Sequence, residues 1–317
     1  MKKALFFTHR NPQGYRIQQY FPFLEARGFT VELLTTETGF LDALERIRGA
    51  DVLYVQRLLL SPLKLPLVRK YAKRIVYDFD DAVFCGAKGE SRTRRAKFRR
   101  MVRAADATFC GNAFLLAEAK RYRQDGLYYV PTVVDMAEYP VKAHGSHGRP
   151  VAGWMGSSST LPYIEDMGGL MRSLAESGRC AFEIVADRPP DMDIPGLTFK
   201  KWEKEKEKAL LLDFDLGLMP LRDDVWSRGK CGLKLVQYMA SGLPSIAHPV
   251  GVANEMIEDG VNGYLRTTQD EWRSAIEDLA GDAVMRARMG RAARDVAETR
   301  YALHVWGPKV AEIMDSL

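Results

Sequence analysis

Glycine and lysine recur in one short run of the sequence, G-K-C-G-L-K at 229–234, at the start of a helix predicted over 232–241. Glycine lets a ligand approach the backbone, and the N–H groups at a helix N-terminus favour an anion. If the helical turn includes both lysines, the ammonium groups of Lys230 and Lys234 can face one phosphate pair. The alternative is a helix that starts at glycine and carries two solvated lysines. The Walker spacing G-x-x-x-x-G-K-[ST] is absent.

A second stretch with phosphate-binding chemistry follows the strand predicted over 151–155. It consists of one glycine and four hydroxyl residues, Gly156, Ser157, Ser158, Ser159 and Thr160. Hydroxyls and backbone N–H groups at the start of a helix can hold phosphate oxygens. Plain N-capping of the next helix by Thr160 is the competing interpretation.

Three carboxylates cluster after a predicted strand over 74–77, at Asp78, Asp80 and Asp81. Like charges at such spacing raise one another's pKa, so keeping all three carboxylates ionised costs free energy. It suits a D-x-D metal site, a general base or hydroxyl-orienting carboxylate for an acceptor, or helix N-capping. These three interpretations remain open at this point.

Short apolar strands and helical patterns alternate along the whole chain, which predicts right-handed βαβ units and parallel sheets. The run Pro140–Pro150 is rich in Gly and Pro and interrupts the series. We therefore predict an α/β protein with a domain over 1–140, a linker over 141–149 and a second domain over 150–299. A last helical segment, 300–317, is expected to cross back to the first domain. Ligands in such folds lie at the carboxyl ends of the strands.

The composition is that of an ordinary soluble protein, with 317 residues, 46% hydrophobic residues and a net charge of +5. The four cysteines show no C-x-x-C spacing, which argues against a zinc site or a disulfide framework and suits a reducing cytoplasm. The apolar run near the N-terminus is too short for a signal peptide, and no window approaches a membrane span. We expect a cytoplasmic protein.

The stretch 211–265 contains D-L-G-L-M-P-L, Y-M-A-S-G-L-P, S-I-A-H-P and V-G-x-x-x-E-M-I-x-D-G-x-N-G-Y-L. It resembles the carboxyl-terminal domain of group 1 glycosyltransferases with the GT-B fold. The resemblance implies two Rossmann-like domains facing a cleft and a nucleoside diphosphate sugar as donor. It also implies that the enzyme requires no cofactor and no metal. The D-x-D metal site is therefore the least favoured of the three interpretations of the acidic segment.

The resemblance assigns donor-binding roles mainly to the second half of the chain. Family members carry two glutamates eight positions apart, and these fall here on Gly229 and Gln237, which leaves the anomeric outcome open. Lys230 and Lys234 would stabilise the leaving diphosphate. The other predicted donor contacts are Gly156, Ser157, Ser158, Ser159, Trp202 beneath the base, Trp226 as a wall for sugar or acceptor, Arg228, Gly251 and Glu255.

Two parts of the first domain are expected near the acceptor. Asp80 or Asp81 would face the cleft as a catalytic carboxylate, and Gly14, Tyr15 and Arg16 open the first helix after the first strand. GT-B enzymes often use that loop near the donor diphosphate and acceptor.

The positive charge is concentrated in one segment, 88–103, which holds eight Lys/Arg and one acid. A helix is predicted there, with Phe98, Met101, Val102 and Ala105 forming one apolar stripe. Its cations could bind an anionic membrane at about 1 kcal/mol each, or could form a plain solvated surface; we see no nucleic-acid motif. The membrane-facing residues would be Arg92, Arg94, Arg95, Lys97, Arg99, Arg100 and Arg103.

The predicted activity is sugar transfer to an acceptor hydroxyl, in synthesis of a cell-surface or lipid-linked glycan. The enzyme would be peripheral on the inner membrane face. Two alternatives remain: a GT-B-fold nucleotide-sugar epimerase or hydrolase, and an inactive nucleotide-sugar-binding protein. Glycine at 229, in place of the first glutamate of the family pattern, favours the inactive binding protein.

Overall fold

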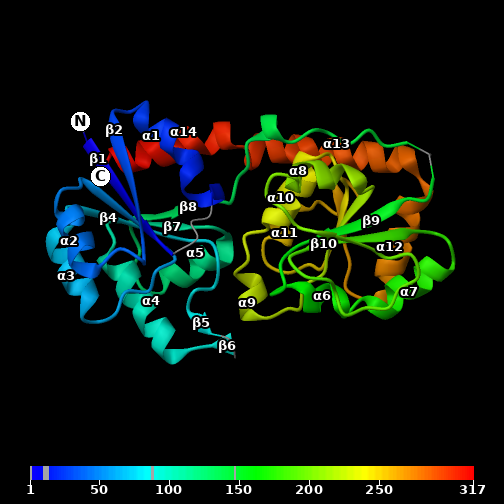
Figure 1. Cartoon of the computed structure of the whole chain (residues 1–317), viewed down its shortest axis with the longest axis horizontal. Coiled ribbons are helices and arrows are strands. Elements are labelled where there is room, and N and C mark those ends of the chain that lie inside the picture. The colour runs from blue at the N-terminus through cyan, green and yellow to red at the C-terminus, as the bar shows by residue number, and fades with distance from the viewer. Residues whose placement is uncertain (1, 10–13, 87–88, 146–147) are drawn as a thin grey trace. The chain divides into compact units, whose positions relative to one another are not determined.

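The computed structural model describes residues 2–9, 14–86, 89–145 and 148–317, and its helices and strands are labelled in Figure 1. The chain forms two compact α/β units. The first comprises Met1–Val133, Asp224–Cys231 and Leu303–Leu317, and the second comprises Val134–Asp223 and Gly232–Ala302. Two six-stranded parallel sheets of this kind are the GT-B fold, as the sequence predicted.

The first unit is built on a parallel sheet with strand order β2-β1-β3-β4-β7-β8. Its strands are apolar on both faces because helices cover both sides. Their bounds are β1 (Lys2–Thr8), β2 (Phe29–Thr35), β3 (Val52–Gln56), β4 (Arg74–Phe79), β7 (Ala107–Cys110) and β8 (Leu127–Tyr129). A separate two-stranded ribbon joins β5 (Cys85–Gly86) to β6 (Gly89–Glu90).

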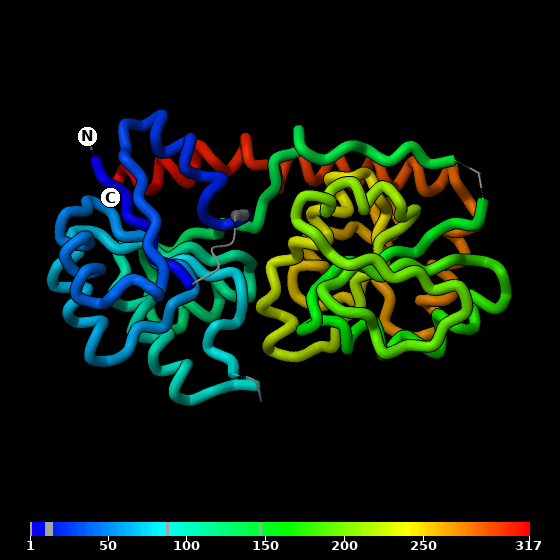
Figure 2. The backbone as a smooth tube through the Cα atoms, viewed as in Figure 1, coloured from blue at the N-terminus to red at the C-terminus, as the bar shows by residue number. Residues whose placement is uncertain are grey.

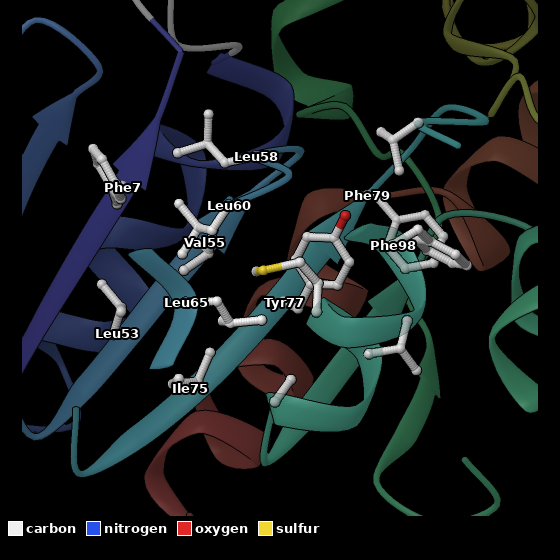
Figure 3. Close-up of a cluster of buried hydrophobic side chains, with 14 of the residues drawn as sticks. Phe7, Leu53, Val55, Leu58, Leu60, Leu65, Ile75, Tyr77, Phe79 and Phe98 are labelled. Atoms are coloured by element: carbon white, nitrogen blue, oxygen red, sulfur yellow. The ribbon is translucent and has the colours of Figure 1, made fainter. Parts of the chain in front are cut away.

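One face of this sheet packs against α2 (Phe40–Arg48), α3 (Lys64–Tyr71), α4 (Arg92–Ala104) and α5 (Ala113–Lys120). Figure 3 shows side chains of β4 directed into this core, where the rings of Phe79 and Phe98 lie 5.0 Å apart. Ile75, Tyr77 and Phe79 alternate along β4 on this side. The residues between them, Val76 and Asp78, therefore face the opposite side of the sheet.

The opposite face is covered by α1 (Phe21–Glu25) and by α14 (Leu303–Asp315). Figure 2 shows the red carboxyl-terminal segment running beside the blue amino-terminal segment. Val310, Ala311 and Met314 are buried on this face. Lys2 pairs with Asp315 at 2.7 Å between ammonium and carboxylate.

The second unit has a parallel sheet with strand order β11-β10-β9-β12-β13-β14. Its strands are β9 (Val151–Met155), β10 (Ala181–Ala186), β11 (Thr198–Lys201), β12 (Leu216–Met219), β13 (Ser245–Ala247) and β14 (Gly263–Leu265). Its helices are α6 (Leu161–Glu165), α7 (Gly168–Glu176), α8 (Glu207–Leu210), α10 (Leu233–Ala240), α11 (Ala253–Met256), α12 (Gln269–Gly281) and α13 (Ala283–Arg300). Within the described ranges, no helix is both long and apolar enough to cross a membrane.

Candidate functional site

The acidic segment after β4 meets an arginine from the neighbouring strand. Arg57 directly follows β3, and β3 and β4 are adjacent and parallel, so their carboxyl ends coincide. The Arg57 Nε lies 2.5 Å from Asp80 Oδ1, and its Nη2 pairs with Asp81. Arg57 thus holds both carboxylates that the sequence predicted as catalytic.

Arg57 also has an unusual backbone. Its φ is 58°, in the left-handed region that non-glycine residues rarely adopt, and its N–H donates to the carbonyl of Asp78 at 2.8 Å. Strain of this kind gathers at functional sites. Sequence reasoning missed Arg57, although the rule that picked out Asp80, a polar residue at a strand's carboxyl end, would have found it.

Arg16 does not have its predicted role beside a ligand. Its side chain is fully buried, donating from Nε to Asp78 Oδ2 at 3.2 Å and from Nη1 to the carbonyl of Val130 at 2.7 Å. The reason is the alternation of β4, which directs Asp78 into the face where Arg16 packs, whereas Asp80 follows the end of the strand at Phe79. Burial raises the pKa of the Asp78 carboxyl, and the charge of Arg16 acts against that rise.

The residues before Arg16 belong to a 3-10 turn over Gly14–Arg16, in which Tyr15 is half-buried. The preceding loop, 10–13, lies outside the described residues. The predicted acceptor role of Gly14 and Tyr15 therefore stays a prediction.

The segment Asp224–Cys231, which includes α9 (Val225–Arg228), belongs to the first unit. A Cβ atom on Gly229 would lie 2.7 Å from Ala82 Cβ and 2.8 Å from Ala82 N, closer than real Cβ contacts. A Cβ on Gly111 would lie 2.3 Å from Cys231 Sγ. Glycine at 229 and 111 therefore allows the segment 224–231 to pack closely against the rest of the first unit. No glutamate side chain fits at 229 in this arrangement.

Lys230 lies in this segment of the first unit and not on helix α10. Helix α10 begins at Leu233, and the chain enters it through Gly232 with φ 68°. The prediction that Lys230 and Lys234 lie one helical turn apart is wrong, because the left-handed Gly232 separates Lys230 from the helix. Lys230 belongs to the first unit and Lys234 to the second.

The ammonium of Lys230 lies 5.0 Å from the ring centroid of Trp226, whose side chain is partly exposed. Burial lowers the pKa of Lys230 below its ordinary value of 10.5, and the charge of Arg57 lowers it further, while Asp224 and Asp80 act in the opposite direction. Arg57, Asp80 and Lys230 thus form one charged group on the first unit.

In the second unit, Lys234 lies at the carboxyl end of β9. Its Nζ is 4.1 Å from the ring centroid of Trp154 and 3.2 Å from Thr160 Oγ1. A Cβ on Gly156 would lie 2.6 Å from this Nζ, so glycine at 156 leaves the space for the ammonium. The sequence predicted Gly156 and Lys234 as donor residues on separate grounds, and the structure brings them together.

The serine loop differs from its predicted phosphate-binding form. The Ser158 N–H and hydroxyl both donate to the carboxylate of Asp187, at 2.5 and 2.7 Å, and Ser157 and Ser159 bond to each other. These hydrogen bonds lower the pKa of Asp187. In this structure the Asp187 carboxylate therefore accepts the hydrogen bonds that the sequence analysis expected Ser158 to donate to a phosphate. Thr160 stands at the N-cap position of α6, but its hydroxyl makes no capping hydrogen bond and donates instead to the Ser157 carbonyl at 3.1 Å.

Trp202 and Gln237, predicted at the base and the ribose, are linked through Glu207. The Trp202 Nε1–H donates to Glu207 Oε2 at 2.8 Å, and Gln237 Nε2 donates to Glu207 Oε1 at 2.6 Å. Gln237 Nε2 also lies 3.2 Å from the Tyr139 hydroxyl. Sequence reasoning missed Glu207 because it sits in a run of alternating Lys and Glu that is typical of a solvated surface.

The remaining predicted donor residues lie on three separate segments of the chain. Gly251 follows β13 with φ 55°, and Glu255 is half-buried on α11. Arg228 is exposed, and its carbonyl accepts from Asn112 at 3.0 Å. Within the described part of the chain, no group of three His, Cys, Asp or Glu residues could hold a metal.

The basic segment forms α4, and its predicted apolar stripe is buried. Two of its arginines are engaged: Arg94 Nε donates to the Val83 carbonyl at 2.8 Å, and Arg95 pairs with Glu90 and Glu118. Lys88 of the same segment lies outside the described residues. The other five cations form no ion pair with the residues that the structure describes; they are Arg92, Lys97, Arg99, Arg100 and Arg103.

Residues 170–282 match the family model described as glycosyl transferases group 1. The matched region is similar in sequence to that family. It contains Trp202, Glu207, Lys234 and Gln237. A curated relative, the alpha-D-kanosaminyltransferase of Streptomyces kanamyceticus, is 25% identical over an alignment of 186 residues, and the match covers 54% of this chain. The match spans about half the length of that relative, 46% of it.

Solved structures resemble the whole chain. Anabaena HepE in complex with UDP and glucose is 17% identical with a TM-score of 0.75, each chain being covered in full. Sucrose-phosphate synthase from Thermosynechococcus elongatus is 13% identical with a TM-score of 0.81, over 100% of this chain and 99% of the other. At these identities the likeness establishes the GT-B fold.

Proposed function

We propose that this chain transfers a sugar from a nucleoside diphosphate sugar to an acceptor hydroxyl. The observation that carries the proposal is Lys234, an ammonium held at the carboxyl end of β9 between Trp154, Thr160 and the gap left by Gly156. Negative charge grows on the departing diphosphate as the bond to the sugar breaks. A fixed ammonium stabilises that charge in the transition state.

The comparisons support the same activity. The family model covers the region that contains Lys234, and HepE is a related fold solved with UDP and with UDP-glucose. We therefore assign donor binding to the second unit, with Trp202 beneath the base, and we expect no cofactor requirement.

The first unit is assigned to the acceptor. Asp81 is the more exposed of the two carboxylates, with 20% of its side chain accessible against 9% for Asp80. We propose that Asp81 accepts a hydrogen bond from the attacking hydroxyl and that Arg57 fixes its orientation. Lys230 adds positive charge to the same group.

The experiment that tests this function is a thermal-shift screen against nucleotide sugars, followed by NMR of the stabilising compound with and without acceptor alcohols. Stabilisation together with transfer that needs an acceptor supports the proposal. Turnover without any acceptor would instead support an epimerase or hydrolase. Stabilisation without turnover under any condition would support an inactive binding protein, for which Gly229 in place of the family's first glutamate is the motivating observation.

We propose further that the acceptor is a lipid-linked or cell-surface glycan intermediate, met at the anionic inner face of a membrane. The support is the outward arc of α4, where Arg92, Arg99 and Arg103 recur at helical spacing with Lys97 and Arg100 beside them. Sedimentation with anionic and neutral liposomes tests this part. Charge reversal at Arg99 and Arg103 should release the chain from anionic vesicles, whereas reversal at the exposed Arg288 and Arg291 of α13 should not. Equal sedimentation with both kinds of vesicle would refute it.

A further inference from the structure

A fully buried ion pair lies near the carboxyl end of β4, in the first unit. The side chains of Arg16 and Asp78 have no exposed area. Arg16 uses all three guanidinium nitrogens: Nε and Nη2 donate to the two carboxylate oxygens of Asp78, and Nη1 donates to the carbonyl of Val130. Replacement of a buried ion pair by apolar side chains of similar volume is often neutral or stabilising. Stability alone therefore does not explain this pair.

The pair connects three strands of the first sheet. Asp78 belongs to β4, and Val130 directly follows β8. Tyr54 of β3 donates its hydroxyl to the backbone carbonyl of Arg16 at 3.3 Å. The strand order is β3-β4-β7-β8, so these contacts reach across the intervening strand β7. The pair thus fixes the carboxyl ends of β3, β4 and β8 relative to one another.

Asp78 also holds the backbone of Arg57. Its carbonyl accepts from the Arg57 N–H at 2.8 Å, and Arg57 has the left-handed φ of 58°. A non-glycine residue keeps this conformation only where the surrounding structure fixes it. The side chain of Arg57 in turn pairs with Asp80 and Asp81. A shift of the Asp78 backbone is therefore transmitted to Arg57 and to both carboxylates.

We infer that Arg16 and Asp78 are positioning residues for sugar transfer. The buried pair fixes the Asp78 backbone, and through Arg57 it holds the Asp81 carboxylate in the orientation that the attacking hydroxyl requires. Neither member of the pair touches substrate, because both are fully buried. The inference rests on the proposed function and adds two residues that act through Arg57. A misplacement of about 1 Å in a reacting group can lower the rate about 100-fold, so a well-fixed backbone matters here.

The test is the full chain with both charges of the pair removed, as Arg16→Met/Asp78→Leu. This double variant should unfold at a temperature no lower than the parent chain. It should bind UDP or GDP, whichever binds the parent, with unchanged affinity, because donor binding is assigned to the second unit. Its kcat/KM for the acceptor alcohol that supports transfer should fall at least about tenfold. Full kcat/KM in the folded double variant would overturn the inference, and so would an equal loss of nucleotide affinity. Absence of transfer by the parent chain would instead overturn the proposed function, and the inference with it.

A milder variant decides the matter if the double variant does not fold. Arg16→Lys keeps a cation beside Asp78, but a single ammonium cannot reproduce the forked contacts of the guanidinium with Asp78 and Val130. Its kcat/KM for the acceptor should fall at least about threefold with nucleotide affinity unchanged. Parental kcat/KM in Arg16→Lys would overturn the positioning role.

The opposite end of β4 offers a matched control. There Arg69 pairs with Asp106 at 2.5 Å, and Asp106 accepts from the backbone N–H of Ile75 at 2.8 Å. Arg69→Met breaks an ion pair that supports the same strand, but far from its carboxyl end. It should lower the unfolding temperature and change kcat/KM less than about twofold. A loss of kcat/KM as large as that of the Arg16 variants would show that any damage to β4 lowers activity, and would overturn the inference.

Discussion

Asn112 and Lys230 are joined by a hydrogen bond of 3.0 Å from the side-chain amide of one to the backbone carbonyl of the other, across 118 positions of sequence. The same amide donates to the carbonyl of Arg228, also at 3.0 Å. Its oxygen accepts from the Leu115 N–H and caps α5. One side chain therefore holds the glycine-lysine segment to the first unit and also starts a helix of that unit.

Replacement of Asn112 should cost stability as well as activity. Asn112→Ala removes the cap and both carbonyl contacts, for an expected loss of about 3 kcal/mol in the free energy of unfolding. Asn112→Asp keeps an acceptor for the cap but sets a carboxylate against two carbonyls. It should therefore retain more stability than the alanine variant while losing activity. Urea unfolding and kcat/KM of both variants check this, and an unchanged urea midpoint for Asn112→Ala would contradict it.

Gly229 should tolerate no side chain. Gly229→Ala places a Cβ against Ala82, and we expect about 1–3 kcal/mol of destabilisation and a loss of activity from the displaced segment. Gly229→Glu, which rebuilds the first glutamate of the family pattern, should be worse and not better. The matched control is Gly169→Ala in α7, where nothing lies within 4 Å of the added Cβ. That change should stabilise the chain by about 0.5–1 kcal/mol, because alanine suits a helix better than glycine.

Removal of the Lys234 ammonium should affect turnover far more than folding. Lys234→Ala should lower kcat/KM for the donor by about 100- to 1000-fold, the range found when a preorganised group that stabilises developing charge is deleted. Lys204→Ala, an exposed lysine of the same unit, should change kcat/KM less than twofold. Steady-state kinetics and thermal unfolding of both variants decide the matter. Full activity of Lys234→Ala would refute its role.

The lowered pKa of Lys230 predicts a specific pH dependence. Because burial and Arg57 disfavour the charged form, the ammonium loses its proton at a lower pH than an ordinary lysine, whose pKa is 10.5. If that charge assists the reaction, the alkaline fall of kcat/KM begins below pH 10.5. Lys230→Arg should move the fall upward, since a guanidinium stays charged. Coincident alkaline limbs for the two proteins would show that Lys230 does not titrate in this profile.

The sheets could be predicted because short apolar runs such as 74–77 and 151–155 are buried on both faces, and a strand buried in this way must be apolar along its length. The position of Lys230 could not, because a glycine such as Gly232 fits both the first turn of a helix and the left-handed turn before it. Glu207 gave no signal, since its burial depends on Trp202 and Gln237 and not on its neighbours in sequence. Arg16 was predicted near the ligands because it follows the first strand, but its burial depends on Asp78, a residue 62 positions away in the sequence.

The packing of α14 has a consequence for how this chain is made. The first sheet is complete once β8 has emerged from the ribosome, but Val310, Ala311 and Met314, which cover one of its faces, follow only after the entire second unit. During that interval an apolar sheet face awaits its covering helix, and exposed apolar surface in a nascent chain favours misassembly. The first unit is thus completed only by α14, a segment that is synthesised after the second unit.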